Sequence, residues 1–369
     1  LLIKQKKYFI LHAPRQTGKT SSMLALQEYL NNKGEYLAIY ANFEVGQASR
    51  NDINGAIAGI IREIKNRIPK NFINHDKMIE AFKELENSSN YTSVLNEFLT
   101  LLSEYSDKPI ILLIDEIDSL VGDTLISVLR QIRAGYDKRP ASFPSSIILC
   151  GVRDIKDYRI QTSGQDIVTG GSAFNIKTKS LRLGNFSKED VINLYTQHTL
   201  ETGQRFEDTC YDLVMDYTDG QPWLVNALAQ EVTYEMPENR DPSVTITPQM
   251  LEIAKERLIL SRQTHLDQLA DKLEEDRVRR VIISMILGKM PDYSKDDEEY
   301  CIDLGLIKKT IEGLQISNSI YKEIIPRELT KLGQENFLSL FRPVWVKSDG
   351  SINVKTLLTL FKDFWNENT

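Results

Sequence analysis

Cysteine and histidine are scarce in this chain, which has three cysteines and four histidines among 369 residues. The cysteines, Cys150, Cys210 and Cys301, each stand alone, and no pair has the spacing of a zinc site. A dispersed, odd number of thiols is typical of reduced cysteines in the cytoplasm. We therefore expect a cytoplasmic protein that does not depend on disulfides or zinc.

Long hydrophobic runs are also missing. No apolar stretch approaches the roughly 20 residues that span a bilayer, and the first residues lack the apolar core of a signal peptide. The net charge of −7 excludes a field that would draw the whole chain to nucleic acid or to an anionic membrane, although a local basic patch could still bind DNA. We expect a globular protein of two or three domains with no membrane partner.

Short apolar runs alternate with helical patterns in the first half of the chain. The runs cover residues 8–12, 36–43, 109–114 and 146–151, and a shorter fifth run covers residues 180–183. Continuous apolar strands separated by helices are typical of a parallel sheet that is covered on both faces. We therefore predict a doubly wound α/β domain over residues 1–184.

The pattern changes after residue 184, where helical periodicity replaces the strands. Ser187 to Asp190 resembles a capping box and begins a helical series, which predicts an all-α lid over residues 185–275. Helices followed by a hairpin signal at Glu312-Gly313 predict a winged helix over residues 276–332. We expect residues 333–369 to form a tail that leads toward a further domain.

A phosphate-binding loop follows the first apolar run. Gly18-Lys19-Thr20 matches the end of the pattern G-x-x-x-x-G-K-[ST], with Ala13 in place of the first glycine. Such a loop surrounds a phosphate with backbone N–H groups at a helix N-terminus, while its lysine bridges phosphate oxygens. The candidate nucleotide-binding residues are Ala13, Pro14, Arg15, Gln16, Thr17, Gly18, Lys19, Thr20 and Ser21.

Two adjacent acids, Asp115 and Glu116, end the apolar run at residues 110–114. Ligands of open α/β sheets bind at this carboxyl edge, so Asp115 and the Thr20 hydroxyl are candidate ligands of Mg²⁺. Glu116 is the candidate general base that activates water. Alone, the two carboxylates could be solvated turn residues, but beside the phosphate loop they favour hydrolysis of ATP, with Lys19 as a further catalytic candidate.

Two further motifs complete a resemblance to a known family. The runs C-G-V-R-D at residues 150–154 and D-G-Q-P-W at residues 219–223, together with the phosphate loop and the Asp-Glu pair, resemble prokaryotic AAA-like ATPases of the STAND and archaeal-ATPase group. The resemblance implies a P-loop ATPase domain, a helical lid and a winged helix. It also implies a sensor role for Arg153 at the γ-phosphate, and adenine contacts for Gly220 and Pro222. Alternatively, Arg153 is a surface arginine that follows a strand, and Gly220 and Pro222 belong to an ordinary helix start.

The same resemblance raises the question of partners. Members of this group often carry a nuclease-like domain after the module, so a nuclease-like domain and DNA are candidate partners. If the chain forms a homo-oligomer, a neighbouring subunit would supply an arginine finger, for which Arg130, Arg133 and Arg139 are candidates. These arginines could equally lie on a solvated helix face.

Three functional hypotheses remain open from the sequence. The first is an ATPase that relays nucleotide state through the lid and the winged helix to a partner or nucleic acid. The second is a nucleotide-controlled switch with slow turnover, and the third is a DNA-binding adaptor with structural ATP. The third depends on basic residues of the winged helix, but nearby acids favour a packing role over DNA binding. The basic residues are Arg277, Arg279, Arg280, Lys308 and Lys309.

Overall fold

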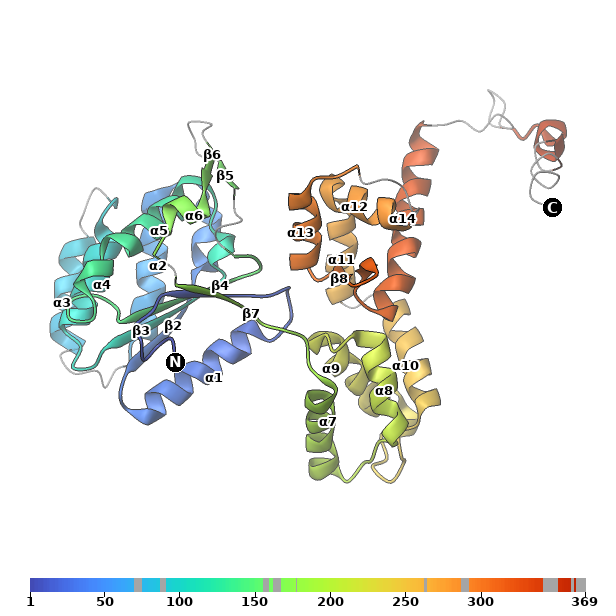
Figure 1. Cartoon of the computed structure of the whole chain (residues 1–369), viewed down its shortest axis with the longest axis horizontal. Coiled ribbons are helices and arrows are strands. Elements are labelled where there is room, and N and C mark those ends of the chain that lie inside the picture. The colour runs from blue at the N-terminus through green and yellow to red at the C-terminus, as the bar shows by residue number, and fades with distance from the viewer. Residues whose placement is uncertain are drawn as a thin grey trace.

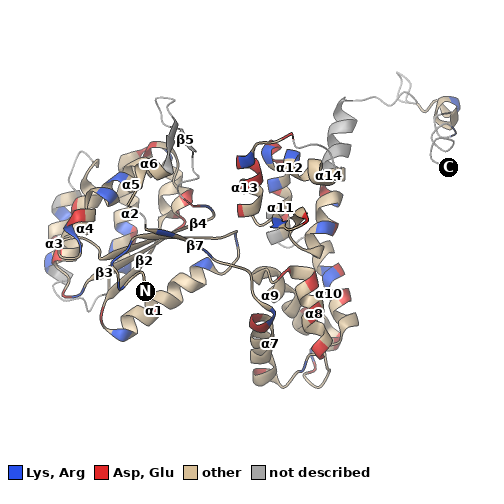
Figure 2. Ribbon diagram, in the orientation of Figure 1, with Lys and Arg blue, Asp and Glu red and all other residues tan. Residues whose placement is uncertain are grey.

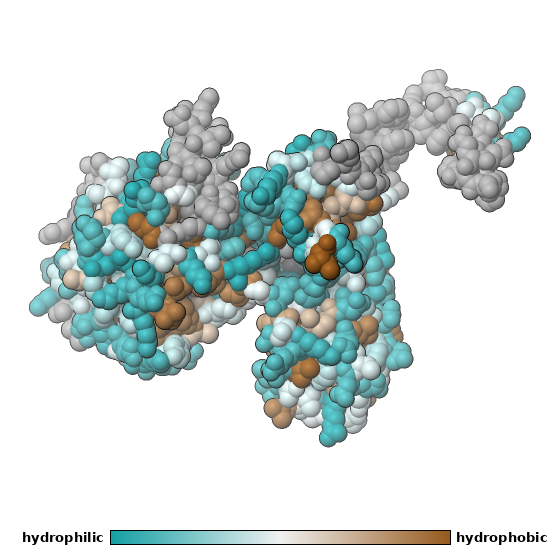
Figure 3. Space-filling view, in the orientation of Figure 1, coloured by the Kyte–Doolittle hydropathy of each residue, from teal (hydrophilic) through white to brown (hydrophobic). Residues whose placement is uncertain are grey.

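The structure is a computed structural model that describes residues 1–69, 75–86, 91–154, 159–161, 167–176, 178–261, 264–286, 292–340, 351–359 and 362. The first part of the chain forms an α/β half and the following part forms a helical half (Figure 1). The space-filling view shows the two halves in contact at the level of the winged helix (Figure 3). Among the described residues, no helix is long and apolar enough to cross a membrane.

A parallel sheet of five strands forms the centre of the α/β half. Its strands are β1 (Phe9–His12), β2 (Leu37–Asn42), β3 (Ile110–Asp115), β4 (Ser146–Gly151) and β7 (Lys179–Arg182). Their order is β2-β3-β4-β1-β7, and all neighbouring pairs are parallel. The predicted α/β fold with a parallel sheet is therefore confirmed.

Helices cover both faces of this sheet (Figure 1). On one face lies α1 (Lys19–Lys33), and on the other lie α2 (Ile53–Arg67), α4 (Val94–Glu104) and α5 (Gly122–Ala134), with α3 (His75–Glu86) packed on α4. Alternate side chains of β3 enter the two cores: Ile110, Leu112 and Ile114 join the larger cluster, and Ile111 and Leu113 join the cluster that includes α1. This explains why the sequence of β3 is apolar throughout.

Short elements connect the main ones in the α/β half. They are the 3₁₀ turns Phe43–Ser49, Ile117–Ser119 and Tyr136–Lys138, the short helix α6 (Gly170–Ala173), and the antiparallel pair β5 (Arg159–Gln161) and β6 (Ile167–Thr169). The turn at residues 117–119 follows β3 directly and therefore lies at the carboxyl edge of the sheet.

The helical half begins after β7. Its first helices are α7 (Lys188–Thr202), α8 (Asp208–Thr218), α9 (Pro222–Gln230), α10 (Pro248–Leu260) and α11 (Thr264–Glu274), with a π-helical turn at Glu231–Glu235 and a 3₁₀ turn at Pro237–Asn239. We call α7 to α11 the lid. A capping box between Ser187 and Asp190 begins α7, as predicted.

Two helices, a hairpin and a long helix follow the lid. They are α12 (Asp276–Ile286), α13 (Lys295–Asp303), β8 (Ile307–Thr310), β9 (Gly313–Ile316) and α14 (Ser319–Leu340), which we call the winged helix. β8 and β9 pair antiparallel across Thr310 and Gly313, so the predicted hairpin is confirmed. One hydrophobic cluster extends from Val191 to Ile325, so the lid and the winged helix share a core. The boundary predicted after residue 275 stays a prediction and falls inside this shared core.

Gly220 offers a test of how the lid is attached. Its φ is 70°, and a Cβ at this position would lie 2.0 Å from the Phe186 carbonyl oxygen. We expect Gly220→Ala to lower the free energy of unfolding by roughly 3 kcal/mol, because the backbone conformation and the clash both cost energy. Urea unfolding of the whole chain measures this change.

Gly203→Ala is the matched control for this substitution. Gly203 has a φ of 86°, but no heavy atom lies within 4 Å of the position of its Cβ. Gly203→Ala should therefore lower the free energy of unfolding by only about 1 kcal/mol, which is the cost of the left-handed backbone conformation alone. Equal losses in the two variants would contradict the close approach at Phe186.

Candidate nucleotide site

The loop between β1 and α1 is closed by its own side chains. The Lys19 ammonium donates hydrogen bonds to the carbonyl oxygens of Ala13 (3.0 Å) and Pro14 (2.8 Å), and the Thr17 hydroxyl donates to Pro14 O (2.8 Å). Gly18 precedes α1 with a φ of 80°, and the first turn of α1 contains no acidic residue. The helix N-terminus therefore favours an anion, and the first turn carries no carboxylate of its own.

A cavity of about 400 Å³, which we call the phosphate cavity, lies against this loop. Its walls combine residues from the loop with acids that follow β2 and β3, namely Arg15, Gln16, Gly18, Lys19, Thr20, Ser21, Glu44 and Glu116. The structure thus brings Lys19 and Glu116, predicted from separate motifs, to one cavity. Ala13 and Thr17 are buried within the loop and do not line it.

Asp115 is the buried centre of the site, with 1% of its surface exposed. Its Oδ2 accepts hydrogen bonds from the Thr20 hydroxyl (2.7 Å) and the Tyr40 hydroxyl (2.9 Å), and its Oδ1 accepts one from the Glu116 N–H (3.0 Å). Burial, reinforced by the charge of Asp115, raises the pKa of Tyr40, so this hydroxyl remains a donor. The carboxylate is therefore fixed against the loop by groups from two neighbouring elements.

Glu116 adopts a left-handed conformation with a φ of 51°, which is uncommon for a residue with a side chain. This conformation follows the end of β3, and the Glu116 carboxylate lies on the cavity wall. Burial raises the pKa of Glu116, as do the charges of Asp118 and Asp115, while Lys19 and Arg15 oppose the shift. A carboxylate with a raised pKa beside a phosphate cavity is suited to accept a proton from water.

Arg153 lies after β4 and is 7% exposed. Its guanidinium pairs with Asp303 at 2.9 Å and with Asp296 at 3.6 Å, and it lies 5.3 Å from the ring centroid of Tyr300. These partners all belong to α13 of the winged helix. Arg153 does not line the phosphate cavity in this structure, so its predicted contact with a γ-phosphate stays a prediction.

The lid approaches the loop at the start of α9. The Gln221 side chain donates to the Gln16 carbonyl oxygen at 3.4 Å, and its Oε1 caps the helix by accepting from Leu224 N at 2.6 Å. Pro222 is buried at the first position of α9. Gln221 therefore contacts the loop, while the predicted adenine contacts of its chain neighbours Gly220 and Pro222 stay a prediction.

A second cavity of about 440 Å³ lies between the loop, the lid and the winged helix. Pro14 and Arg15 form part of its wall, and Gly305, in the turn between α13 and β8, forms another part. The approach is close, because a Cβ on Gly305 would lie 2.9 Å from Pro14 Cγ. The winged helix therefore packs directly against the phosphate loop, a contact between segments far apart in the sequence.

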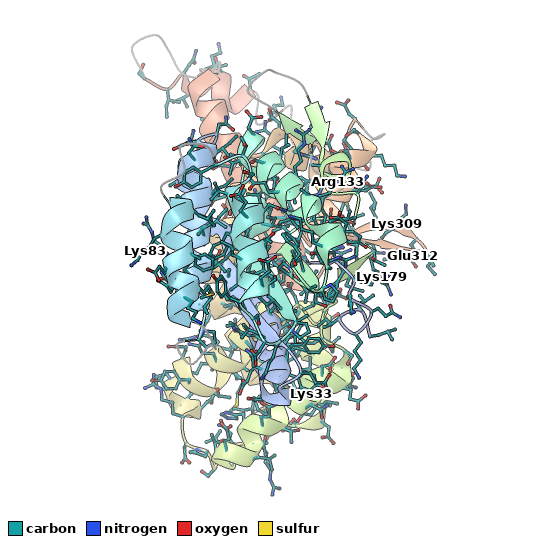
Figure 4. The ribbon with its side chains drawn as sticks, turned by 90° about the vertical axis from the view of Figure 1, so that its left-hand side faces the viewer. Lys33, Lys83, Arg133, Lys179, Lys309 and Glu312 are labelled. Carbon is teal, nitrogen blue, oxygen red and sulfur yellow. The ribbon has the colours of Figure 1, made fainter. Side chains whose placement is uncertain are left out.

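The basic residues proposed for DNA contact all have acidic partners. Arg277 pairs with Asp296 at 3.0 Å, and Lys309 lies 3.9 Å from Glu298 while projecting outward from the wing (Figure 4). Several acidic residues lie on α13, which is on the side of the winged helix toward the α/β half (Figure 2). The remaining pairs are Arg279 with Asp276, Arg280 with Asp297, and Lys308 with Asp219. These intramolecular pairs favour the packing interpretation of the winged helix over DNA binding.

The candidate finger arginines lie elsewhere. Arg139 lies 3.4 Å from the ring centroid of Tyr136 and donates to backbone oxygens of Tyr136 and Lys6. Arg130 and Arg133 lie on the second half of α5, and neither lines the phosphate cavity. Their role between subunits stays a prediction.

Sequence reasoning missed three residues of the site: Tyr40, Glu44 and Cys150. Tyr40 is a polar hydroxyl within the apolar run of β2, and this interruption was the available signal. Glu44 follows β2 as Glu116 follows β3, so an acid just past a parallel strand was the signal there. Cys150 is buried beside Asp115, and burial, reinforced by Asp115, raises the pKa of its thiol.

The strand order, the phosphate loop after β1 and the acids after β3 define a P-loop nucleotide-binding protein. The model of the AAA-like domain family matches residues 2–327, and the chain belongs to this family. Membership implies nucleotide binding by a P-loop ATPase domain. No curated protein matches the chain.

Solved structures similar to this chain come from archaea and bacteria. The Walker-type ATPase PABY2304 of Pyrococcus abyssi has a TM-score of 0.52 and 15% identity, over 87% of this chain and 91% of that one. Cdc6p from Pyrobaculum aerophilum has a TM-score of 0.45 and 16% identity, over 91% and 90%. The RuvB Holliday junction branch migration motor of Thermotoga maritima has a TM-score of 0.43 and 13% identity, over 88% and 90%. At 15% identity, the similarity to the Pyrococcus abyssi protein concerns the fold alone.

The hydrogen bond from Tyr40 to Asp115 can be tested by removing one oxygen atom. Tyr40→Phe leaves part of a buried carboxylate unsatisfied, so we expect the free energy of unfolding to fall by about 1–3 kcal/mol. Tyr36→Phe is the control, because Tyr36 is only half-buried and packs at the edge of the same core. A urea midpoint for Tyr40→Phe equal to that of the control would contradict the role of this hydroxyl.

Proposed function

We propose that this chain binds ATP with Mg²⁺, hydrolyses it, and relays the nucleotide state through the lid and the winged helix. One observation carries the proposal: Asp115, buried at the end of β3, accepts a hydrogen bond from Thr20 of the phosphate loop at 2.7 Å. This contact joins the two motifs that ATP hydrolysis needs. Glu116 then lies on the wall of the same cavity as Lys19.

The residues present fit a magnesium ion. The Thr20 hydroxyl lines the phosphate cavity, and the buried Asp115 carboxylate accepts its hydrogen bond from behind at 2.7 Å. Both are hard oxygen donors, which is the ligand type that Mg²⁺ prefers. Thr20 and Asp115 would hold the ion, directly or through water. When bound, Mg²⁺ supplies neutralising charge to the phosphate oxygens.

The phosphate loop would bind the triphosphate through its backbone N–H groups and through Lys19. In this structure Lys19 donates to carbonyl oxygens of its own loop, and these bonds hold the ammonium at the cavity until phosphate oxygens replace them. Glu116 would accept a proton from the attacking water. Water oxygen bonds to the γ-phosphorus, the bond from that phosphorus to the bridging oxygen breaks, and the products are ADP, inorganic phosphate and a proton.

Contacts between the halves support a relay of nucleotide state. Gln221 of the lid contacts the Gln16 carbonyl oxygen, and Gly305 of the winged helix packs against Pro14. A phosphate that moves the loop would therefore move both neighbours. The contact of Gln221, which lies between Gly220 and Pro222, with the loop supports an adenine site framed by the lid, as in the STAND-type group that the sequence resembles.

A slowly turning switch is the second candidate function, and the position of Arg153 favours it. Asp303 and Asp296 of the winged helix hold this arginine, which we propose as the sensor of the γ-phosphate. ATP and the winged helix would then compete for one guanidinium. We place either activity in the cytoplasm, in line with free and buried Cys150, Cys210 and Cys301.

Hydrolysis is tested by replacing its proposed base and its phosphate-binding lysine. Glu116→Gln should lower kcat by at least about 100-fold while ATP still binds, because the amide cannot accept the proton. Lys19→Ala should abolish ATP binding. Steady-state phosphate release and nucleotide titration measure the two effects.

Glu104→Gln, on the exposed end of α4 away from the cavity, is the control for charge removal. Its turnover should equal that of the wild-type chain. Unchanged phosphate release in Glu116→Gln would rule out this residue as the base.

The relay is tested at Asp303. Asp303→Asn removes the charge that pairs with Arg153 at 2.9 Å, which weakens the contact between the halves by about 1–3 kcal/mol. We expect more hydrogen exchange in α13 and faster ADP release. Asp212→Asn is the control, since Asp212 pairs with Lys188 at the lid surface. If both variants keep wild-type exchange and ADP release, the Arg153 contact carries no nucleotide signal.

A further inference from the structure

Arg15 stands where several cavities meet at the phosphate loop. It lines the phosphate cavity with Lys19 and Glu116, and it also lines the second cavity under the lid and the winged helix. A third cavity of about 240 Å³, between the loop, α11 and the winged helix, has Arg15 on its wall as well. Arg15 therefore lines both the phosphate cavity and the cavities between the loop and the winged helix.

Arg15 differs from the other basic residues around these cavities, which already have hydrogen-bond or ion-pair partners. Lys19 donates to carbonyl oxygens of the loop, and Arg182 donates to the Ile302 carbonyl oxygen. The remaining partnered cations are Lys272, Lys308 and Lys309. Arg15 is exposed and has no ion-pair partner among the residues that the structure describes. Its guanidinium is available to an anion that enters the phosphate cavity.

The loop holds the backbone of Arg15 in place. The Thr17 hydroxyl and the Lys19 ammonium both donate to the carbonyl oxygen of Pro14, the residue before Arg15. The Gln221 side chain donates to the carbonyl oxygen of Gln16, the residue after Arg15. Because the backbone is held, only the side-chain torsions of Arg15 must become ordered on binding, and the planar donors of its guanidinium match phosphate oxygens. The attacking water must lie between Glu116 and the γ-phosphorus. A cation on the same wall as Glu116 is therefore placed for the γ-phosphoryl oxygens.

We infer that Arg15 is a catalytic arginine supplied in cis, which binds the γ-phosphoryl oxygens of ATP and stabilises their charge during hydrolysis. The inference rests on the proposed function and assigns to the loop the role otherwise sought in a neighbouring subunit. Arg130, Arg133 and Arg139 line none of the cavities at this loop. Because Arg15 also borders the winged helix, its side chain distinguishes ATP from ADP at the contact between the halves.

Three substitutions separate charge from geometry at this position: Arg15→Ala, Arg15→Gln and Arg15→Lys. We expect Arg15→Ala and Arg15→Gln to lower kcat by at least about 100-fold, as removal of an arginine at a transferring phosphoryl group does. Arg15→Lys should recover part of the loss, because it keeps the charge without the planar fork. ADP affinity should stay within about twofold of wild type, while ATP affinity falls, because only ATP carries the γ-phosphate.

Arg62→Ala provides the matched control, since Arg62 is an exposed arginine on α2, away from the phosphate cavity. Its kcat and its affinities for ATP and ADP should equal those of the wild-type chain. Equal loss of ATP and ADP affinity in Arg15→Ala would show that the side chain merely supports the loop, and would overturn the inference.

A mixing experiment separates action in cis from action in trans. Arg15→Ala supplies Glu116 without the arginine, and Glu116→Gln supplies the arginine without the base. An equimolar mixture should show no more phosphate release than the mean of the separate variants if Arg15 acts within its own chain. Activity restored by mixing would overturn the assignment in cis.

The failure of this inference can be told apart from failure of the proposed function. If wild type releases phosphate and Arg15→Ala does so equally fast, the hydrolase stands and the role of Arg15 is wrong. If wild type releases none, the proposed hydrolysis fails. A selective loss of ATP affinity over ADP affinity in Arg15→Ala would then still support the contact with the γ-phosphate.

Discussion

The hydrogen bond between Thr20 and Asp115 is the contact on which the site depends. It joins the phosphate loop to the end of β3 across the intervening strand β4. Asp115 is buried, and a buried carboxylate without hydrogen-bond partners would be costly. The Tyr40 hydroxyl and the Glu116 N–H donate further hydrogen bonds to this carboxylate. Satisfying this one charge fixes the loop, the strand end and the following acid in one arrangement.

The winged helix also contacts the phosphate loop. Its acidic helix α13 pairs with Arg153, and the turn at Gly305 packs on Pro14. A surface rich in carboxylates is poorly suited to a phosphate backbone but well suited to an arginine of its own chain. The charge pattern therefore favours this intramolecular contact over a contact with nucleic acid, and it lies next to the phosphate loop.

Much of the α/β half could be predicted, because its signals are local. Buried parallel strands are continuous apolar runs, so β3 and β4 were evident, and the glycine and lysine of the loop are required by phosphate chemistry. The hairpin β8–β9 was similarly marked by Glu312-Gly313. The extent of α14, which continues to Leu340, was not predicted, since helix ends depend on packing as well as on periodicity.

The sequence by itself determined the class of fold, the phosphate loop and the acids at the end of β3, because each depends on short-range pattern or on residue chemistry. Only the tertiary structure decided that Tyr40 completes the shell of Asp115, that Arg153 pairs with α13, and that Arg15 faces several cavities. Those contacts join segments separated by tens to hundreds of positions. No local periodicity records such a contact, since it arises when burial and charge pairing bring the two halves together.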